Sequence, residues 1–92
     1  MKYFDWDKEK NEILKAQRDI CFEDIVAVIE DDGILEIVEH PNKKRYPNQK
    51  VFVLAINEYV YLVPFVEDEE KFFLKTIIPS RKATKKYLEE KK

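Results

Sequence analysis

The residues best suited to chemistry are basic, and one group of them stands near the end of the chain in "PSRKATKK", residues 79–86. Ser80 is typical of a helix N-cap, so Arg81 and Lys82 would occupy the first turn of a helix. Cations are unfavourable for the helix at that end, which suggests another use. Arginine can grip a phosphate through two parallel hydrogen bonds, and lysine adds a point charge. The segment therefore predicts either an anion site or an ordinary solvated terminal helix.

A second basic segment is "HPNKKRYPNQK", residues 40–50, which has four lysines and arginines and no acidic residue. It is flanked by strand-like sequence, so we expect a surface loop, where functional groups often lie. Arg45 beside Tyr46 suits RNA, because a guanidinium group and an aromatic ring can both stack on bases. Tyr46 could equally well anchor the loop on the core.

The other candidates favour structural roles. His40 is the only histidine and could carry a proton near neutral pH, or simply end a strand at the surface. Cys21 is the only cysteine; a helix start could lower its pKa, but a small buried side chain is the better interpretation. The carboxylates of Glu67–Glu70 are adjacent in a turn and lack a calcium-loop pattern, so we expect solvated charge, with no metal and no cofactor.

Composition indicates one small domain, residues 1–92. The apolar fraction is 45%, which is enough for a core, and the chain is too short to divide. Residues 80–92 carry six basic and two acidic side chains, a net charge of +4, while the whole chain carries −2; residues 1–79 therefore sum to −6. A lone cysteine, the lack of a signal-peptide pattern and the short apolar runs predict a cytoplasmic protein without membrane contact.

Periodicity predicts the elements that position these groups. Two helices are expected after a short strand at residues 2–6: one over Asp7–Arg18 with Asp7 as N-cap and Ile13, Leu14 and Gln17 on one side, and one over Phe22–Glu30. The only glycine, Gly33, should end the second helix in a turn.

Strands dominate the second half. We expect strands at residues 35–39, 50–56, 59–67 and 71–78, with Asn57 in a two-residue hairpin turn. Pro64 has no N–H to donate and predicts an edge strand or a bulge. Ala83, Thr84, Tyr87 and Leu88 should pack the last helix on the sheet. The order is βααββββα, an α+β fold with helices packed on an antiparallel sheet.

Four stretches in this order resemble the BrnT family of small ribonuclease toxins from type II toxin–antitoxin modules, which have a RelE-like fold. They are "FDWDKEKNEILK", "ICFEDIVAVIED", "KKRYPNQKVFV" and "IIPSRKATKKYLEE". The resemblance covers nearly the whole chain. It implies metal-independent cleavage of RNA that blocks translation. It also implies a ribbon-helix-helix antitoxin as partner, with operator DNA bound only through the toxin–antitoxin complex.

The resemblance also implies roles for residues. Asp7 and Lys10 match the family's "WDxxK" element, Arg45 the loop arginine, and Arg81 and Lys82 the basic start of the last helix. Arg45 and Arg81 would stabilise charge on the phosphate as a ribose 2′-OH attacks it, and Lys82 or Lys10 would orient it. The further RNA-binding residues would be Lys43, Lys44, Tyr46, Lys85 and Lys86.

A second interpretation is a relative with weak or no cleavage, which acts as a protein-binding module for the antitoxin. Where the family commonly has a "KHG" run, this chain has "KAQRDI", so a histidine is lost and Arg18 stands nearby. The acidic body also favours binding a basic partner over RNA. An arrangement with Arg45 and Arg81 on one concave surface would favour the enzyme.

Overall fold

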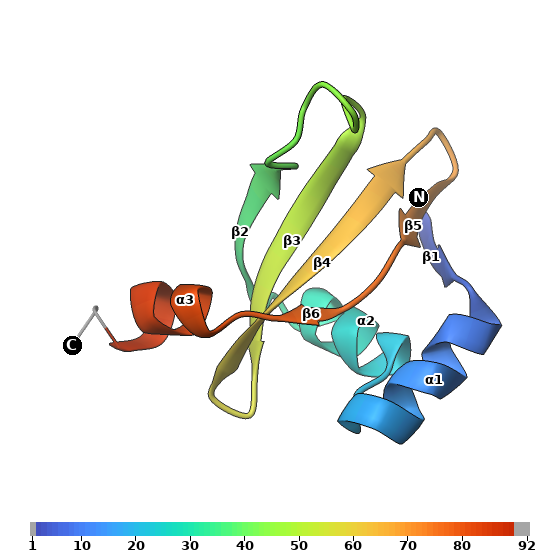
Figure 1. Ribbon diagram of the computed structural model, residues 1–92. Coiled ribbons are helices and arrows are strands. Elements are labelled where there is room, and N and C mark those ends of the chain that lie inside the picture. Colours follow the sequence, from blue (N-terminus) through green and yellow to red (C-terminus); the bar gives the residue numbers. More distant parts are fainter. Residues whose placement is uncertain (1, 90–92) are drawn as a thin grey trace.

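A computed structural model describes residues 2–89 and shows an α+β fold, with helices packed on a mixed sheet (Figure 1). The elements follow the predicted order, with one additional short strand. The strands are β1 (Tyr3–Trp6), β2 (Ile34–Glu39), β3 (Gln49–Ile56), β4 (Tyr59–Glu67), β5 (Lys71–Leu74) and β6 (Ile78–Pro79). The helical segments are α1 (Lys8–Arg18), α2 (Phe22–Glu30), α3 (Arg81–Thr84) and a wider π-helical turn, η1 (Lys85–Glu89), that continues α3.

The sheet has the order β1-β5-β4-β3-β2, and β6 pairs with β4 beyond the end of β5. The expected antiparallel pairing holds for every pair except one. Strand β1 runs parallel to β5, with Tyr3 opposite Lys71 and Trp6 opposite Leu74. This parallel pair makes the sheet mixed rather than purely antiparallel. Because β1 and β5 are far apart in sequence, no short turn forces them to be antiparallel.

The last predicted strand, residues 71–78, is shorter than expected. β5 ends at Leu74, and Lys75–Ile77 lead to β6. Pro64 lies opposite this interruption, in the interior strand β4 rather than at an edge or a bulge. Its carbonyl oxygen accepts the Lys75 N–H at 2.8 Å, so its backbone faces the gap between β5 and β6. A proline is tolerated because the missing N–H falls where the neighbouring strand is broken.

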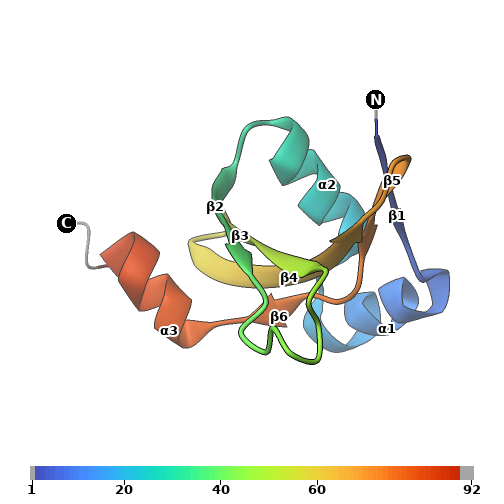
Figure 2. The ribbon, with the colours of Figure 1, turned by 90° about the horizontal axis from the view of Figure 1, so that it is seen from above.

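The core lies between the two N-terminal helices and the sheet. Figure 2 shows α2 on one side of the strands, with β6 and α3 toward the other side. Leu14 of α1 is buried, but Ile13, expected beside it, is 52% exposed and faces outward. Buried apolar side chains from five elements and the connections beside them form one cluster: Leu14, Ile20, Phe22, Ile25, Phe52, Leu54, Val63, Phe65, Leu74 and Ile77.

The turns follow local chemistry. The Asp7 carboxylate caps α1 by accepting the N–H groups of Glu9 and Lys10. The β3–β4 hairpin turns through Asn57 and Glu58, both with positive φ, as a type I′ turn requires. Gly33 was expected to end α2 in a turn, and within that turn Asp32 takes the left-handed conformation, with φ of 61°.

Gly33 is required for a different reason, a close approach to α2. Its N–H donates to the carbonyl oxygen of Val28 at 2.8 Å. A Cβ atom at this position would lie 2.5 Å from Cγ1 of Val28 and 2.8 Å from its carbonyl oxygen.

None of the helices within residues 2–89 is long and apolar enough to cross a membrane.

Candidate functional site

The basic start of α3 is held against β4 by the Thr84 hydroxyl and the Ser80 backbone N–H. The Ser80 hydroxyl accepts the N–H of Ala83 at 3.1 Å, as expected for an N-cap. The Thr84 hydroxyl donates to the Ser80 carbonyl at 2.7 Å and accepts the N–H of Val60 at 2.9 Å. The Ser80 N–H in turn donates to the Val60 carbonyl at 3.0 Å. Both backbone groups of Val60 are therefore paired with the Ser80–Thr84 turn.

This attachment decides which side chains of the last helix face solvent. Thr84 is buried, and Ala83, Tyr87 and Leu88 are half-buried, as the sequence predicted for the packed face. The cations Arg81, Lys82, Lys85 and Lys86 are all exposed. A row of cations is thus displayed on a helix whose first turn is anchored to the sheet.

The far end of the same helix is tied to β2. The Tyr87 hydroxyl donates to the Glu36 carboxylate, and this hydrogen bond raises the pKa of Tyr87. Lys86 lies over the Tyr87 ring at 5.3 Å from its centre. The helix is therefore held at both ends, which limits the freedom of the cations between them.

A groove of about 480 Å³ runs along α1 and places further polar groups near the segment that leads to α3. Lys10 and Arg18 line it together with Thr76, which comes from the β5–β6 connection. Arg18 also donates from Nη1 to the Ile77 carbonyl at 2.9 Å, which joins α1 to that connection. The other lining residues are Asp7, Glu9, Ile13, Leu14 and Gln17.

Arg18 and Thr76 were not among the site residues predicted from sequence. An arginine in the last turn of a helix is favoured by the helix dipole. This local explanation was sufficient for Arg18, so nothing in the sequence predicted its contact with Ile77. Thr76 had been placed inside a strand and gave no signal of a groove. Lys10 had been predicted, and it lies on α1 rather than beside Arg81.

The 40–48 loop is organised by its own side chains. The His40 and Tyr46 rings are 4.5 Å apart, and Arg45 lies over the Tyr46 ring at 5.6 Å. Asn42 donates its N–H to Nδ1 of His40 and accepts the Arg45 N–H. Lys43 pairs with Glu39 at the end of β2. Of the predicted loop residues, Lys43, Lys44 and Arg45 are exposed, while Tyr46 is half-buried beside the His40 ring.

Arg45 and Arg81 do not form one compact pair. The loop joins β3 near Lys50, whereas the α3 turn docks on Val60, whose partner in β3 is Ala55. Ala55 is five positions from Lys50, which at about 3.4 Å per residue separates the attachment points by about 17 Å. Both segments nevertheless lie toward the same side of the sheet, away from α2 (Figure 2).

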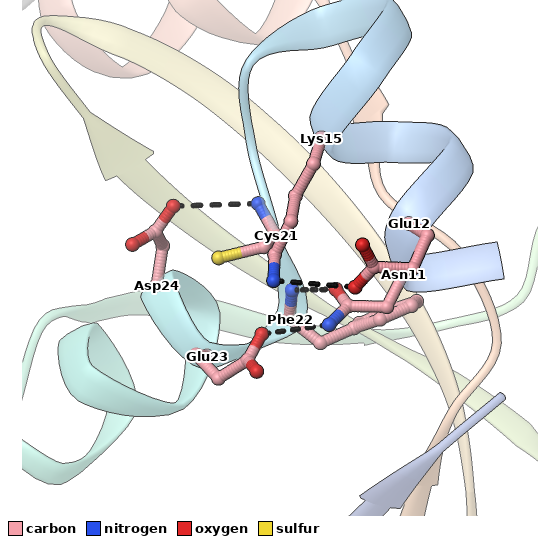
Figure 3. Close-up of polar contacts among 7 residues, drawn as sticks. All are labelled: Asn11, Glu12, Lys15, Cys21, Phe22, Glu23 and Asp24. Carbon is pink, nitrogen blue, oxygen red and sulfur yellow. Dashed lines mark hydrogen bonds and ion pairs between the residues drawn. The ribbon is translucent and has the colours of Figure 1, made fainter. Parts of the chain in front are cut away.

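A polar cluster joins α1 to α2 and includes Cys21, the single cysteine considered from the sequence (Figure 3). Asn11 is buried; its Oδ1 accepts the N–H of Phe22, and its Nδ2 donates to the Glu23 carboxylate, both at 2.7 Å. The hydrogen bond from Nδ2 of Asn11 is the main cause that lowers the pKa of Glu23. Burial, with the Asp24 and Glu23 carboxylates adding to it, raises the pKa of the Cys21 thiol. The alternative weighed for Cys21, a pKa lowered by the helix start, is therefore wrong.

No group of three or more histidine, cysteine or carboxylate side chains within residues 2–89 is arranged to hold a metal ion. The arrangement that the structure does build is cationic. It consists of the α3 row and the 40–48 loop. The α1 groove adds Lys10 and Arg18, but Asp7 and Glu9 line it as well.

The chain was compared with protein families, curated proteins and solved structures. A family model described as the ribonuclease toxin BrnT of type II toxin–antitoxin systems matches residues 6–86. The matched range begins with the last residue of β1 and ends inside η1, so it contains α1, α2 and every strand after them. No curated protein and no solved structure matches the chain.

Proposed function

The chain belongs to the BrnT family of ribonuclease toxins from type II toxin–antitoxin systems, and from this membership we propose how it cleaves RNA. The cleavage uses the exposed cations of α3 and the 40–48 loop, with no metal ion. Arg81, Lys82, Arg45 and Lys10 contact the phosphate that reacts or its neighbours. Cleavage of RNA in this way blocks translation.

The observation that carries the proposal is the anchored start of α3. Ser80 and Thr84 hold the helix on β4, so Arg81 and Lys82 are displayed at a fixed place. A fixed cation stabilises developing charge better than a mobile one, because it needs no reorganisation during the reaction. Arginine also presents a planar pair of donors that fits two phosphate oxygens.

The reaction that fits these groups uses the RNA as its own nucleophile. A ribose 2′-OH attacks the adjacent phosphorus, the 2′-oxygen–phosphorus bond forms, and the bond from phosphorus to the 5′-oxygen of the next nucleotide breaks. The products are a cyclic phosphate and a free 5′-OH. Charge accumulates on the non-bridging oxygens, where Arg81 and Lys82 stabilise it. Because the attacking oxygen is already in the substrate, the protein contributes mainly orientation and charge.

The separation of the basic segments supports contact with several nucleotides of one strand. Single-stranded nucleic acid is bound by cationic surfaces that follow the backbone, with aromatic rings against bases. Arg81 with Lys82, Lys85 and Lys86 would hold one stretch of backbone. Arg45 with Lys43 and Lys44 would hold another about 17 Å away along β3, and the groove with Lys10 and Arg18 lies beside the connection to α3.

The type II family implies an antitoxin partner. We propose that it is a ribbon-helix-helix protein, and that operator DNA is contacted only through the toxin–antitoxin complex. The acidic body, which sums to −6 over residues 1–79, suits a basic partner of this kind.

The second candidate is a binding module with weak or no cleavage. It is favoured by the position of His40, whose Nδ1 accepts a hydrogen bond inside the 40–48 loop, apart from α3. The two candidates share the fold and the antitoxin, and they differ in whether the cations of α3 act on a bound RNA.

The test is cleavage of RNA by protein made in a cell-free system, with a chelator present. The wild type should cut, and Arg81→Ala should cut about 10²-fold more slowly, as for loss of one charge-stabilising donor. Lys8→Ala, which removes one exposed cation from the start of α1, should cut like the wild type.

Other outcomes separate the alternatives. Activity that disappears with the chelator contradicts the metal-independent mechanism. A folded wild type that does not cut, and whose induction does not arrest growth, leaves the binding module. Equal cutting by Arg81→Ala and the wild type removes Arg81 from the reaction.

A further inference from the structure

On the α2 side of the sheet, away from α3, an apolar groove of about 310 Å³ lies open between α2 and the strands. Its floor and walls come from five strands and one helix. The apolar residues that line it are Phe4, Ile29, Ile37, Phe52, Phe65 and Phe72, with Ile34 at its end. It is separate from the α1 groove and from the cations of α3, so the proposed cleavage makes no use of it.

The groove leaves apolar side chains open to solvent, and Ile37 is the most exposed of them. Ile37 is paired with Phe52 across β2 and β3, and while Phe52 is 3% exposed, Ile37 is 51% exposed. β2 is an edge of the sheet, and no strand within residues 2–89 pairs with its outer side. A rim of polar groups around open apolar surface is typical of a protein-binding site.

The rim is predominantly acidic. Glu67 lines the groove, and Asp68, Glu69 and Glu70 continue from it in the β4–β5 turn. At the other end, Glu30, Asp31 and Asp32 follow Ile29 directly, and all of these carboxylates are exposed. Three cations lie nearby. Lys50 lines the groove, Lys2 is paired with Glu67 and lies over the Phe72 ring at 5.4 Å from its centre, and Lys71 is paired with Asp5.

The shape favours a helix over a strand as the occupant. An added strand would pair with the outer edge of β2. The register of this strand shifts between Ile34 and Glu36, and Glu36 and Glu39 place charges along it. Both features discourage strand addition. The groove instead lies on the face of the sheet beside α2, where an amphipathic helix can insert side chains from one of its faces.

We propose that this groove anchors an amphipathic, net-basic helix of the antitoxin partner. The apolar face of that helix packs on Ile37, Phe52 and Phe72, and its lysines and arginines meet the carboxylates of the rim. The proposal rests on the toxin–antitoxin assignment, and it places the anchor on the side of the sheet opposite the α3 cations. Antitoxin affinity and RNA cleavage therefore depend on different residues.

The test measures binding of the protein encoded by the reading frame next to the toxin gene, with the toxin purified from the complex and refolded. Ile37→Glu places a charge in the groove and should weaken binding at least tenfold, as for a central apolar contact. The matched control is Ile13→Glu on α1, because Ile13 has an exposed fraction of 52% against 51% for Ile37. This control should bind within about twofold of the wild type.

Two further measurements sharpen the result. Ile37→Thr keeps a branched side chain suited to a strand, so it should fold like the wild type and still bind several-fold more weakly. Wild-type affinity should fall several-fold between 0.05 and 0.5 M salt, because the rim and the helix carry opposite charges. Thermal unfolding of each variant shows that it is folded.

The outcomes separate this proposal from the assignment on which it rests. Equal binding by Ile37→Glu and Ile13→Glu overturns the groove while leaving the antitoxin in place, and affinity independent of salt overturns the basic occupant. Lack of binding by the folded wild type removes the antitoxin assignment as well. A dimer of the free toxin that Ile37→Glu dissociates also overturns the proposal, since a second copy then fills the groove.

Discussion

The side chain of Thr84 takes the place of a strand neighbour for Val60. Its hydroxyl accepts the Val60 N–H at 2.9 Å, while the Ser80 N–H donates to the Val60 carbonyl at 3.0 Å. The ladder between β4 and β6 thus continues into the first turn of α3. The helix that carries the cations after Ser80 therefore begins at a fixed position on the sheet.

Replacing Thr84 by valine should destabilise the protein by about 1–3 kcal/mol. Valine has the same shape but no hydroxyl, so the buried N–H of Val60 would lose its partner. Thr84→Ser keeps the hydroxyl and should cost less. Urea unfolding of both variants measures the difference, and equal stability of the two would show that the hydroxyl does not hold the helix.

The same pair of variants tests the display of the α3 cations. Thr84→Val leaves Arg81 and Lys82 unchanged but loosens their attachment, so RNA cleavage should fall while Thr84→Ser stays near the wild type. Full activity of a folded Thr84→Val protein would contradict the need for an anchored helix start.

Substitution should destabilise the protein much more at Gly33 than at Asp32. Gly33→Ala places a Cβ within 2.8 Å of a backbone oxygen of Val28, and the overpacking should cost about 1–3 kcal/mol. Asp32→Gly instead relieves a positive φ and should change the unfolding free energy by less than about 1 kcal/mol. Thermal unfolding decides between them, and a harmless Gly33→Ala would show that α2 and β2 can separate at this point.

The contact of Asn11 with Glu23 should make the free energy of unfolding depend on pH. Because the Asn11 amide lowers the pKa of Glu23, this contribution is fully present above the ordinary glutamate pKa of 4.5 and is lost as pH falls through the lower folded value. The unfolding free energy of the wild type should therefore decline below about pH 4.5, and Asn11→Ala should flatten part of that decline. An identical pH profile for the variant would contradict the coupling.

Asn11→Asp tests the same contact with the opposite sign. It places a second carboxylate beside Glu23, which raises the folded pKa of the pair. The variant should be less stable than the wild type at neutral pH and should approach it as the pH falls and one carboxyl becomes protonated. A loss of stability that does not change with pH would indicate a packing effect instead.

Arg18→Ala should loosen the connection between α1 and α3. It removes the hydrogen bond to the Ile77 carbonyl, which should cost about 1 kcal/mol of unfolding free energy. RNA cleavage should fall less than in Arg81→Ala, since Arg18 acts through the segment that carries the α3 row. Lys15→Ala removes an exposed cation from the same helix and serves as the control.

The sequence alone determined the elements whose signals lie within a few residues. Phe22–Glu30 and Tyr59–Glu67 have the predicted bounds, and Asp7 and Ser80 are the predicted caps. Caps and two-residue turns depend on hydrogen bonds between near neighbours, so their residues can be recognised in isolation. The family followed from the same short motifs in their order.

Only the tertiary structure decided how these elements meet. The parallel pairing of β1 with β5, the buried amide of Asn11 and the contact of Arg18 with Ile77 all join residues distant in sequence. The separation of Arg45 from Arg81 also depends on where two segments join the β3–β4 hairpin. Local propensity carries no information on such contacts, because they are selected by burial and by the pairing of backbone groups across the whole sheet.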